Sequence, residues 1–518
     1  MTLARAATGT SSELTLALNP EATHKATLKA TLERPASAWS PVRDADRTLV
    51  EQLVDHLARQ IDEHVLRAGT RLPSIRDMAQ QMGVSRFTVV EAYDRLAAQG
   101  VIASRRGAGF FVQSRAPAPS DGGPYLAAPE PMAPQRMDIP WLLRSMFGST
   151  VQPGMPGGAG LLPAAWMDGD MVMSAVRAVG RTAGASVLHY GVPQGYAPLR
   201  QQIAAGLRQE DVPAHADRNI LTTAGVTHAL TLIVRHFVRP GDTVLVEDPG
   251  WCVVYGQLQA AGANVVGVPR RADGPDLEVL EAMAARHRPK LFIINTPVHN
   301  PTGLALTAGN GHAILRLAER YDFTVVEDDT YGELHPGGAV HLAAMDGLRR
   351  VVRVGGYSKM MAPSLRVGYL AAAPELTRAL TDEKLLSGLT TPEMGERIVH
   401  RVLVDGPYRR YVERVRARVN AARDTCVARL LELGFTLPFE PRAGMFVWAD
   451  CGMDGETLAR AGSARQLLLA PGSLYSPSQT PSPYMRFTVS MAEHPAVWRT
   501  LAQVMADVRG GVSPNGRK

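Results

Sequence analysis

From about residue 164 onward, short β-rich runs alternate with stretches of helical periodicity. A helix that follows a strand carries the chain back to the same end of the sheet, so the next strand pairs in parallel. The pattern therefore predicts a layered α/β domain with a mainly parallel sheet. The expected strands include residues 243–247, 263–268, 291–295, 324–327, 351–354 and 367–372.

Lys359 lies between the last two of these runs, in the segment GGYSKMMAPSLRVGYL, residues 355–370. The chain has six lysines, and only this one lies between two largely apolar, strand-like runs. A lysine kept from water has a lowered pKa, so its neutral amine can attack a carbonyl carbon. Arg366 could hold an anionic group nearby. The pair indicates a Schiff-base lysine beside a phosphate site; the alternative is a surface lysine that snorkels at a loop.

The length of the chain and its cysteines limit the class of protein. A chain of 518 residues is too long for one hydrophobic core, so two or three domains are expected. Its three cysteines have neither metal-ligand spacing nor the pattern of a disulfide framework. Because no run of about 18 uncharged apolar residues and no signal-peptide core occurs, we expect a cytoplasmic protein without a membrane segment.

Changes in composition predict where the domains begin and end. Residues 1–40 mix Thr, Ala, Ser and Pro without periodicity, which is typical of a disordered tail. Residues 115–163 are rich in Pro, Ala and Gly and predict a linker, within which the apolar stretch 139–147 could dock on a domain. The two domains are therefore expected at residues 41–114 and 164–510, the second ending in a smaller α+β part.

The first domain has the pattern of a helix-turn-helix. Apolar residues recur at helical spacing over 48–67 and predict a first helix. A second helix begins at Ser74, where Asp77 takes the place that a capping box usually gives to Glu or Gln, and it ends at Gly83. Ser85 then caps a third helix. Two short helices joined by a glycine turn form a helix-turn-helix.

Charge favours nucleic acid as the partner of this domain. Residues 71–115 hold seven arginines against three acids. The third helix presents side chains near its amino end, where a recognition helix meets DNA, and residues 101–112 predict a hairpin wing with arginines at its tip. The alternative is a small helical bundle that happens to be basic. The candidate DNA-binding residues are Arg76, Ser85, Arg86, Thr88, Arg105 and Arg106.

The residues of this domain also resemble a known family. The motifs are LPS-x-R at 72–76, GVSR-x-TV at 83–89 and AY-x-x-L at 92–96. They closely resemble the winged helix-turn-helix of the GntR family of bacterial regulators. The resemblance implies binding to double-stranded operator DNA.

Four further motifs of the second domain lie near strand ends. Residues 222–227 open the helix 228–237, whose free N–H groups could bind phosphate. The side-chain amide of Asn300 could donate to a phenolate oxygen, and one of the carboxylates of Glu327, Asp328 and Asp329 could pair with a protonated pyridine nitrogen. Trp251 could stack on an aromatic ring. Ordinary turns, a helix cap and a core tryptophan are the alternatives for each motif alone.

In their order and spacing these motifs resemble a fold-type I pyridoxal phosphate protein of the aspartate aminotransferase superfamily, over about residues 164–510. With the first domain, the whole resembles the MocR subfamily of GntR regulators. The resemblance implies a multidomain protein: a winged helix-turn-helix, mainly α, joined to an α/β fold-type I transferase domain. It also implies pyridoxal 5'-phosphate as cofactor and a head-to-tail homodimer.

The resemblance further implies a role for each matched residue. Lys359 forms the internal aldimine, and an amino acid or amine effector exchanges with it to form an external aldimine. One departure is Gly356, where relatives carry Ser or Thr; the lost hydrogen bond, about 1.5–3 kcal/mol, predicts weaker cofactor binding. In the remaining roles Asp328 holds the pyridine nitrogen, Asn300 and Tyr331 hold the ring oxygen, Trp251 stacks on the ring, Val226, Thr227 and Arg366 bind the phosphate, Tyr190 reaches the phosphate of the neighbouring subunit, and Arg486 clamps a carboxylate.

Three functions are compatible with these residues. The first is a transcriptional regulator that senses an amino acid or amine through its cofactor. The second is a working aminotransferase that carries a DNA-binding domain, since the residues needed for turnover are present. The third, a basic nucleic-acid-binding protein with an inactive cofactor fold, is disfavoured because Lys359, Asp328 and Arg486 are intact. No metal site is predicted.

Overall fold

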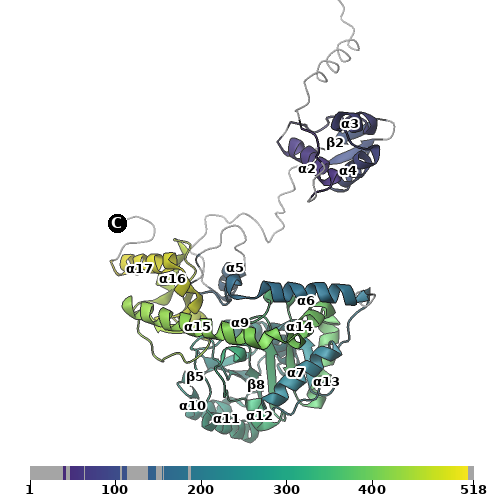
Figure 1. The fold of residues 1–518 in the computed structure, drawn as a ribbon. Coiled ribbons are helices and arrows are strands. Elements are labelled where there is room, and N and C mark those ends of the chain that lie inside the picture. The colour runs from purple at the N-terminus through teal and green to yellow at the C-terminus, as the bar shows by residue number, and fades with distance from the viewer. Residues whose placement is uncertain are drawn as a thin grey trace, which may run out of the picture. The chain divides into compact units, whose positions relative to one another are not determined.

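A computed structural model describes residues 39–42, 47–63, 65–105, 108–113, 138–147, 155, 157–184 and 188–510. The chain divides into two compact units, residues 1–134 and 135–518 (Figure 1). Each unit has a hydrophobic core of its own. Apart from its last two residues, the predicted tail lies outside the described part of the chain.

The first unit contains three helices and a two-stranded hairpin. Tyr93 lies at its centre, fully buried, and its hydroxyl donates a hydrogen bond to the carbonyl of Pro73 at 3.0 Å. This bond ties the third helix to the residues just before the second. The elements are α2 (Leu49–Asp62), α3 (Ile75–Met82), α4 (Arg86–Ala98), β1 (Ile102–Arg105) and β2 (Gly109–Val112), the two strands pairing antiparallel.

Side-chain caps fix where these helices begin. The Ser85 hydroxyl accepts the N–H of Thr88 at 3.0 Å, as predicted for the start of α4. At α3 only half of the expected capping box forms. The Ser74 hydroxyl accepts a hydrogen bond from the N–H of Asp77, but the Asp77 carboxylate accepts one from the Ser74 hydroxyl and not from the Ser74 N–H. The complete capping box lies at α2, between Thr48 and Glu51. Helix α2 ends at Asp62, short of the predicted residue 67.

The second unit is built on an eight-stranded mixed sheet with the order β3-β10-β9-β8-β7-β4-β5-β6. Strands β9, β8, β7, β4 and β5 are mutually parallel, whereas β10 runs antiparallel to both neighbours. The predicted strands are confirmed to within a few residues. Their bounds are β3 (Ile220–Thr223), β4 (Thr243–Asp248), β5 (Asn264–Arg271), β6 (Gly274–Pro275), β7 (Leu291–Asn295), β8 (Thr324–Asp328), β9 (Val351–Gly356) and β10 (Gly368–Ala371).

Helices cover this sheet, and a smaller antiparallel sheet of order β11-β13-β12 follows it. In Figure 1, α10, α11 and α12 lie along one side of the large sheet, and the long α15 runs above it toward α16 and α17. The small sheet consists of β11 (Phe446–Asp450), β12 (Ala470–Pro471) and β13 (Tyr484–Thr488). The helices are α6 (Gly169–Thr182), α7 (Ala197–Gln209), α8 (Val226–Phe237), α9 (Cys252–Ala260), α10 (Leu277–His287), α11 (Ala308–Tyr321), α12 (Leu342–Asp346), α13 (Pro374–Gly388), α14 (Glu393–Val404), α15 (Pro407–Glu432), α16 (Gly455–Ser463) and α17 (Pro495–Arg509).

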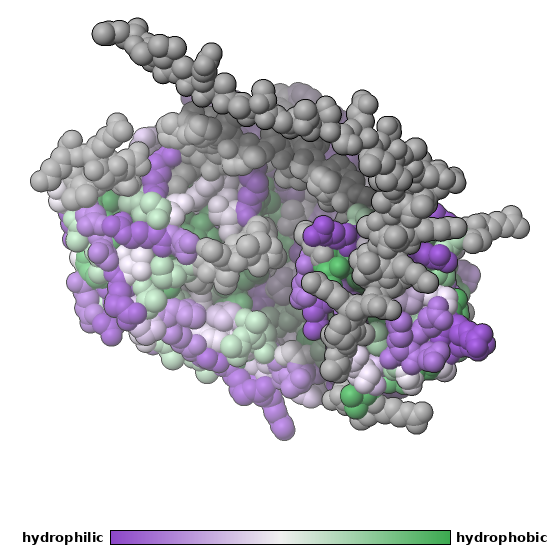
Figure 2. Space-filling model, turned by 90° about the horizontal axis from the view of Figure 1, so that it is seen from above, coloured by the Kyte–Doolittle hydropathy of each residue, from purple (hydrophilic) through white to green (hydrophobic). Residues whose placement is uncertain are grey.

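The apolar stretch of the predicted linker forms helix α5 (Ile139–Phe147), which packs on α9. Trp141 and Leu142 are buried there, so the stretch docks on the second unit. On the face seen in Figure 2, hydrophilic and hydrophobic residues are interspersed among the coloured atoms, which is ordinary for a globular exterior. None of the helices in the described ranges is long and apolar enough to cross a membrane.

Candidate cofactor and ligand site

The residues predicted to bind the cofactor follow the carboxyl ends of neighbouring parallel strands. Asp328 is the last residue of β8, Asn300 follows β7, and Lys359 follows β9. Carboxyl ends of parallel strands lie at one edge of a sheet, which is where α/β proteins bind ligands. The structure brings these residues together with Arg486, which lies on β13 of the small sheet, so the site is shared by both sheets.

Lys359 is partly buried and points into this site. Its Nζ lies 5.7 Å from the ring centre of Tyr331 and donates a hydrogen bond to the carbonyl of Gly160 at 2.8 Å. Burial and the nearby Arg486 guanidinium lower the pKa of Lys359 to about 8. The neutral amine that a nucleophilic lysine requires is therefore much more populated near neutral pH than it is for an exposed lysine.

Asp328 supplies a buried carboxylate. Its Oδ1 accepts hydrogen bonds from the N–H of Thr330 at 2.9 Å and from the Thr330 hydroxyl at 2.5 Å. Burial raises the pKa of Asp328, and the bonds from Thr330 oppose that rise. A buried carboxylate is costly unless a cation pairs with it. A protonated ring nitrogen would be such a cation.

Arg486 is fully buried inside a cage of aromatic rings. Its Cζ lies 4.2 Å from the ring centre of Phe446, 5.0 Å from Tyr475 and 5.5 Å from Trp251. The two Nη atoms donate to Asn300 Oδ1 at 3.1 Å and to the Gly158 carbonyl at 2.8 Å. No carboxylate pairs with this guanidinium among the described residues, so its charge calls for an anionic ligand.

Three buried polar atoms around this cage have no hydrogen-bond partner among the described residues. They are Arg486 Nε, Asn300 Nδ2 and Tyr475 Oη. Buried polar atoms are rarely left unpaired in folded proteins. The two N–H donors and the hydroxyl therefore suit a ligand that carries acceptor oxygens, such as a carboxylate or an oxygen on an aromatic ring.

The phosphate end of the site is formed by the start of α8. Val226 and Thr227 are its first two residues, and their backbone follows Gly225, which has φ +82°. Arg366 lies beside this turn and donates to the Ala224 carbonyl at 3.2 Å. A helix amino terminus next to a guanidinium forms an anion cradle. A Cβ added at Gly225 would lie 2.7 Å from Arg366 Nη2, so the glycine permits this approach.

The position of Gly356 is tightly packed. A Cβ added there would lie 3.2 Å from Val226 Cγ2 and 3.3 Å from the Gly368 Cα. A side chain at this position would therefore require the Val226 side chain or the backbone near Gly368 to move by a few tenths of an ångström. The neighbours of Gly356 are therefore adapted to glycine.

Tyr190 is not brought to the site of its own subunit. Its side chain is 82% exposed. The expectation that it reaches a neighbouring subunit therefore stays a prediction. The other predicted cofactor residues, Trp251, Tyr331 and Arg366, lie around Lys359 and Arg486 as described above.

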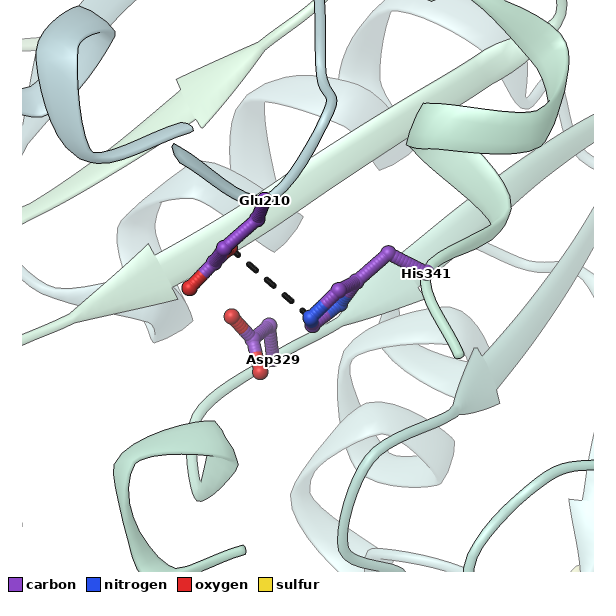
Figure 3. Close-up of side chains that lie close together, drawn as sticks. All are labelled: Glu210, Asp329 and His341. Atoms are coloured by element: carbon purple, nitrogen blue, oxygen red, sulfur yellow. Dashed lines mark ion pairs between the residues drawn. The ribbon is translucent and has the colours of Figure 1, made fainter. Parts of the chain in front are cut away.

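No sequence motif indicated a charged cluster at Asp329, one residue after the end of β8. Glu210, Asp329 and His341 converge there (Figure 3). Arg353 is almost fully buried, and its Nη2 pairs with Glu210 at 2.5 Å and with Asp329. Burial and Arg353 lower the pKa of His341 to about 4, so its ring is neutral. The Arg353 guanidinium supplies a cation for this cluster, which is a partly exposed ion network in which the Glu210 side chain is 44% exposed.

The candidate DNA-binding residues are presented on the surface of the first unit. Arg76 of α3 and Arg86 of α4 are exposed, and Thr88 lies in the first turn of α4. Arg105 lies over the ring of Phe111, 4.8 Å from its centre, and Arg106 is outside the described residues. Phe87, an apolar side chain that the charge pattern does not reveal, is 75% exposed beside Arg86.

Comparison with known families agrees with both halves of this description. The family described as aminotransferase class I and II matches residues 162–496, and the family described as bacterial regulatory proteins, gntR family, matches residues 49–112. The first match covers more than half of the chain, which therefore belongs to the aminotransferase class I and II family. Together the two matches give the chain the architecture of MocR-type regulators, which confirms the resemblance drawn from its motifs.

Individual relatives include both enzymes and regulators. The 2-aminoadipate transaminase of Thermus thermophilus is 32% identical over 64% of this chain and 84% of its own length. The uncharacterized HTH-type transcriptional regulator YdcR of Escherichia coli is 28% identical over 85% of this chain and 94% of its own. The probable rhizopine catabolism regulatory protein MocR of Rhizobium meliloti is 31% identical over 64% and 67%.

A solved structure extends the comparison to three dimensions. It is the α-aminoadipate aminotransferase LysN of Thermus thermophilus, complexed with N-(5'-phosphopyridoxyl)-L-leucine. It is 26% identical, covers 72% of this chain and 96% of its own, and superposes with a TM-score of 0.64. The fold-type I architecture predicted for the second domain is thereby confirmed.

Proposed function

We propose that the protein is a transcriptional regulator whose affinity for operator DNA is set by an amino acid or amine bound with pyridoxal 5'-phosphate. Residues 41–114 bind the DNA, and residues 164–510 bind the cofactor and ligand. The observation that carries the proposal is the presence, in one chain, of a gntR domain and of an intact site around Lys359 and Arg486. A protein that binds operator DNA works in the cytoplasm.

Each site residue has a task when the cofactor is bound. Pyridoxal phosphate supplies an aldehyde that condenses with amines and a ring that withdraws electrons. Lys359 offers the neutral amine, and the Asp328 carboxylate holds the proton of the ring nitrogen. Asn300 and Tyr331 would hold the ring oxygen, Trp251 would stack on the ring, and Val226, Thr227 and Arg366 would bind the phosphate.

Arg486 favours a ligand that carries a carboxylate. Its aromatic cage excludes water, which strengthens a charge-assisted pair. The orphaned Nε adds a second donor beside the Nη atoms, so a carboxylate can bind in bidentate fashion. An α-amino acid would satisfy both Arg486 and the amine site at Lys359.

Regulation requires that the ligand bind one arrangement of the protein better than another. Such linkage needs no turnover. In the proposed homodimer, ligand binding in the second domain changes how the two DNA-binding units are held. Tyr190, exposed in the single chain, would complete the phosphate site of the partner subunit.

An active aminotransferase is the second candidate. The similarity to the 2-aminoadipate transaminase favours it, because that relative is matched over most of its length. Similarity to a regulator over 85% of this chain favours the first candidate, the transcriptional regulator, because that similarity extends beyond the aminotransferase part.

One set of measurements separates the two candidates. The protein is reconstituted with pyridoxal phosphate and mixed with a panel of amino acids, while absorption near the imine band, keto-acid release and affinity for fluorescent operator DNA are followed. A spectral change with altered DNA affinity and no turnover supports the regulator. Release of keto acid, with regeneration by a second keto acid, supports the enzyme. Material that stays colourless, or a borohydride label away from Lys359, would refute both.

A further inference from the structure

A short glycine-rich segment crosses the ligand site and fills it with backbone carbonyl groups. We call residues 157–160 the glycine segment. The carbonyl of Gly160 accepts a hydrogen bond from Lys359 Nζ at 2.8 Å, and the carbonyl of Gly158 accepts one from Arg486 Nη2 at 2.8 Å. The segment therefore occupies the two cationic groups that the proposed function assigns to the cofactor and to the ligand carboxylate.

The glycine segment is held in place by the small sheet. The Thr488 N–H donates to the Gly157 carbonyl at 2.8 Å, and the Gly158 N–H donates to the Leu468 carbonyl at 2.7 Å. A Cβ added at Gly158 would lie 2.6 Å from the backbone nitrogen of Ala470. Only glycine allows the backbone to approach so closely at this position.

Helix α5 approaches the segment at Gly160 through the side chain of Met146. A Cβ added at Gly160 would lie 3.0 Å from Met146 Cε, and one added at Gly256 of α9 would lie 3.8 Å from Ile139. In chain order α5 stands between the DNA-binding unit and the segment. A displacement of the segment therefore acts on Met146 and on the helix that the linker enters.

We propose that the glycine segment is an internal competitor of the ligand. The proposal rests on the proposed function, because it assigns the regulation of the same site. Without ligand, Gly158 and Gly160 satisfy Arg486 and Lys359. A carboxylate is a stronger acceptor for a guanidinium than a peptide carbonyl, so a carboxylate-bearing ligand displaces Gly158 and moves the segment together with α5. The cofactor would take over the contact at Lys359, so the ligand competes at Arg486: an α-amino acid replaces Gly158 there, whereas a simple amine leaves that bond in place.

The competition at Arg486 can be tested without cofactor, using hexanoate as a carboxylate that has no amine. In the full-length chain, Gly158→Ala forces the segment away from Ala470. We expect hexanoate to bind about tenfold more tightly in calorimetric titrations, since the carboxylate no longer competes with a charge-assisted bond. Gly169→Ala is the matched control, because no atom lies within 4 Å of a Cβ added there. Unchanged or weaker binding in Gly158→Ala would overturn the proposal.

Hydrogen exchange of the wild-type chain provides a test that needs no variant. The Gly158 N–H donates from the segment to Leu468, and the Thr488 N–H donates to Gly157 of the segment. Both amide hydrogens should exchange faster when hexanoate binds, because displacement of the segment breaks these bonds. Retained protection at saturating hexanoate would also overturn the proposal. Failure of pyridoxal phosphate to react at Lys359 would instead refute the proposed function, since neither experiment contains the cofactor.

Discussion

At the scale of single residues, the depressed pKa of Lys359 determines how cofactor loading depends on pH. Burial and Arg486 lower this pKa to about 8, whereas an exposed lysine has a value of about 10.4. The rate of association with pyridoxal phosphate should therefore rise with pH and level off just above pH 8, as the neutral amine becomes the main form. Stopped-flow absorption at the imine band measures this profile. A rate that keeps rising toward pH 10 would contradict a depressed pKa.

The depressed pKa of Lys359 also determines whether the free energy of unfolding rises or falls with pH. Between about pH 8 and the unfolded value, the unfolded chain binds more protons at Lys359 than the folded one, so this residue makes the cofactor-free protein more stable as pH rises through that window. Lys359→Met should remove this contribution. Urea unfolding of both proteins on either side of pH 8 measures the difference.

Tyr475 is the residue whose contribution the local sequence least revealed. Its hydroxyl is buried without a partner among the described residues, and its ring lies 5.0 Å from Arg486 Cζ. Tyr475→Phe should leave the ligand-free protein as stable or more stable, because an unsatisfied buried hydroxyl is removed. Ligand affinity should fall about fivefold if that hydroxyl bonds to the ligand, the loss of about 1 kcal/mol. Thermal unfolding and ligand titration together distinguish this pattern from simple damage to the core, which would lower both.

At the scale of elements, the cap of α4 links helix stability to DNA binding. The Ser85 hydroxyl accepts the N–H of Thr88 at 3.0 Å, so Ser85→Ala should destabilise the first unit by about 1 kcal/mol. Ser85→Asp keeps an acceptor at the cap and suits the helix dipole, so stability should stay near that of the wild type. Its charge would repel phosphate, and affinity for operator DNA should fall. Urea unfolding and fluorescence anisotropy test the two effects; equal DNA affinity of Ser85→Asp would remove Ser85 from the interface.

Elements with local signals were predictable, and contacts between distant elements were not. The strand at 291–295 matches β7 because apolar runs between turns define buried strands. That Asn300, Asp328 and Lys359 share one site was predicted from the family resemblance, and the structure gives the physical reason, because all three follow the carboxyl ends of neighbouring parallel strands. The ion network around Arg353 and the carbonyls of the glycine segment have no such signal, because they depend on tertiary packing of segments far apart in the sequence.

At the scale of the whole molecule, two units joined through a linker require that a signal cross from the ligand site to the DNA-binding residues. The chain offers one continuous route in the described part of the second unit: Arg486, the glycine segment and α5 are in contact in that order. Hinges and docked helices that have two arrangements are the usual carriers of such coupling. Variants that uncouple ligand binding from DNA binding are therefore expected in α5 and the glycine segment. They are not expected in the core of the large sheet.

If the cofactor site is formed by residues of two subunits, only the dimer can bind pyridoxal phosphate fully. Variants of Tyr190 test whether this residue completes the site of the neighbouring subunit. Tyr190→Phe should weaken pyridoxal phosphate binding although the residue is 82% exposed on its own chain. Leu188→Ala, at a neighbouring position that is 81% exposed, serves as the control and should bind normally. Mixing Tyr190→Phe subunits with Lys359→Ala subunits creates heterodimers in which one site regains both Lys359 and Tyr190. Absorption titration of the mixture should recover wild-type affinity in that fraction of sites, whereas an intrasubunit role for Tyr190 would leave every site impaired.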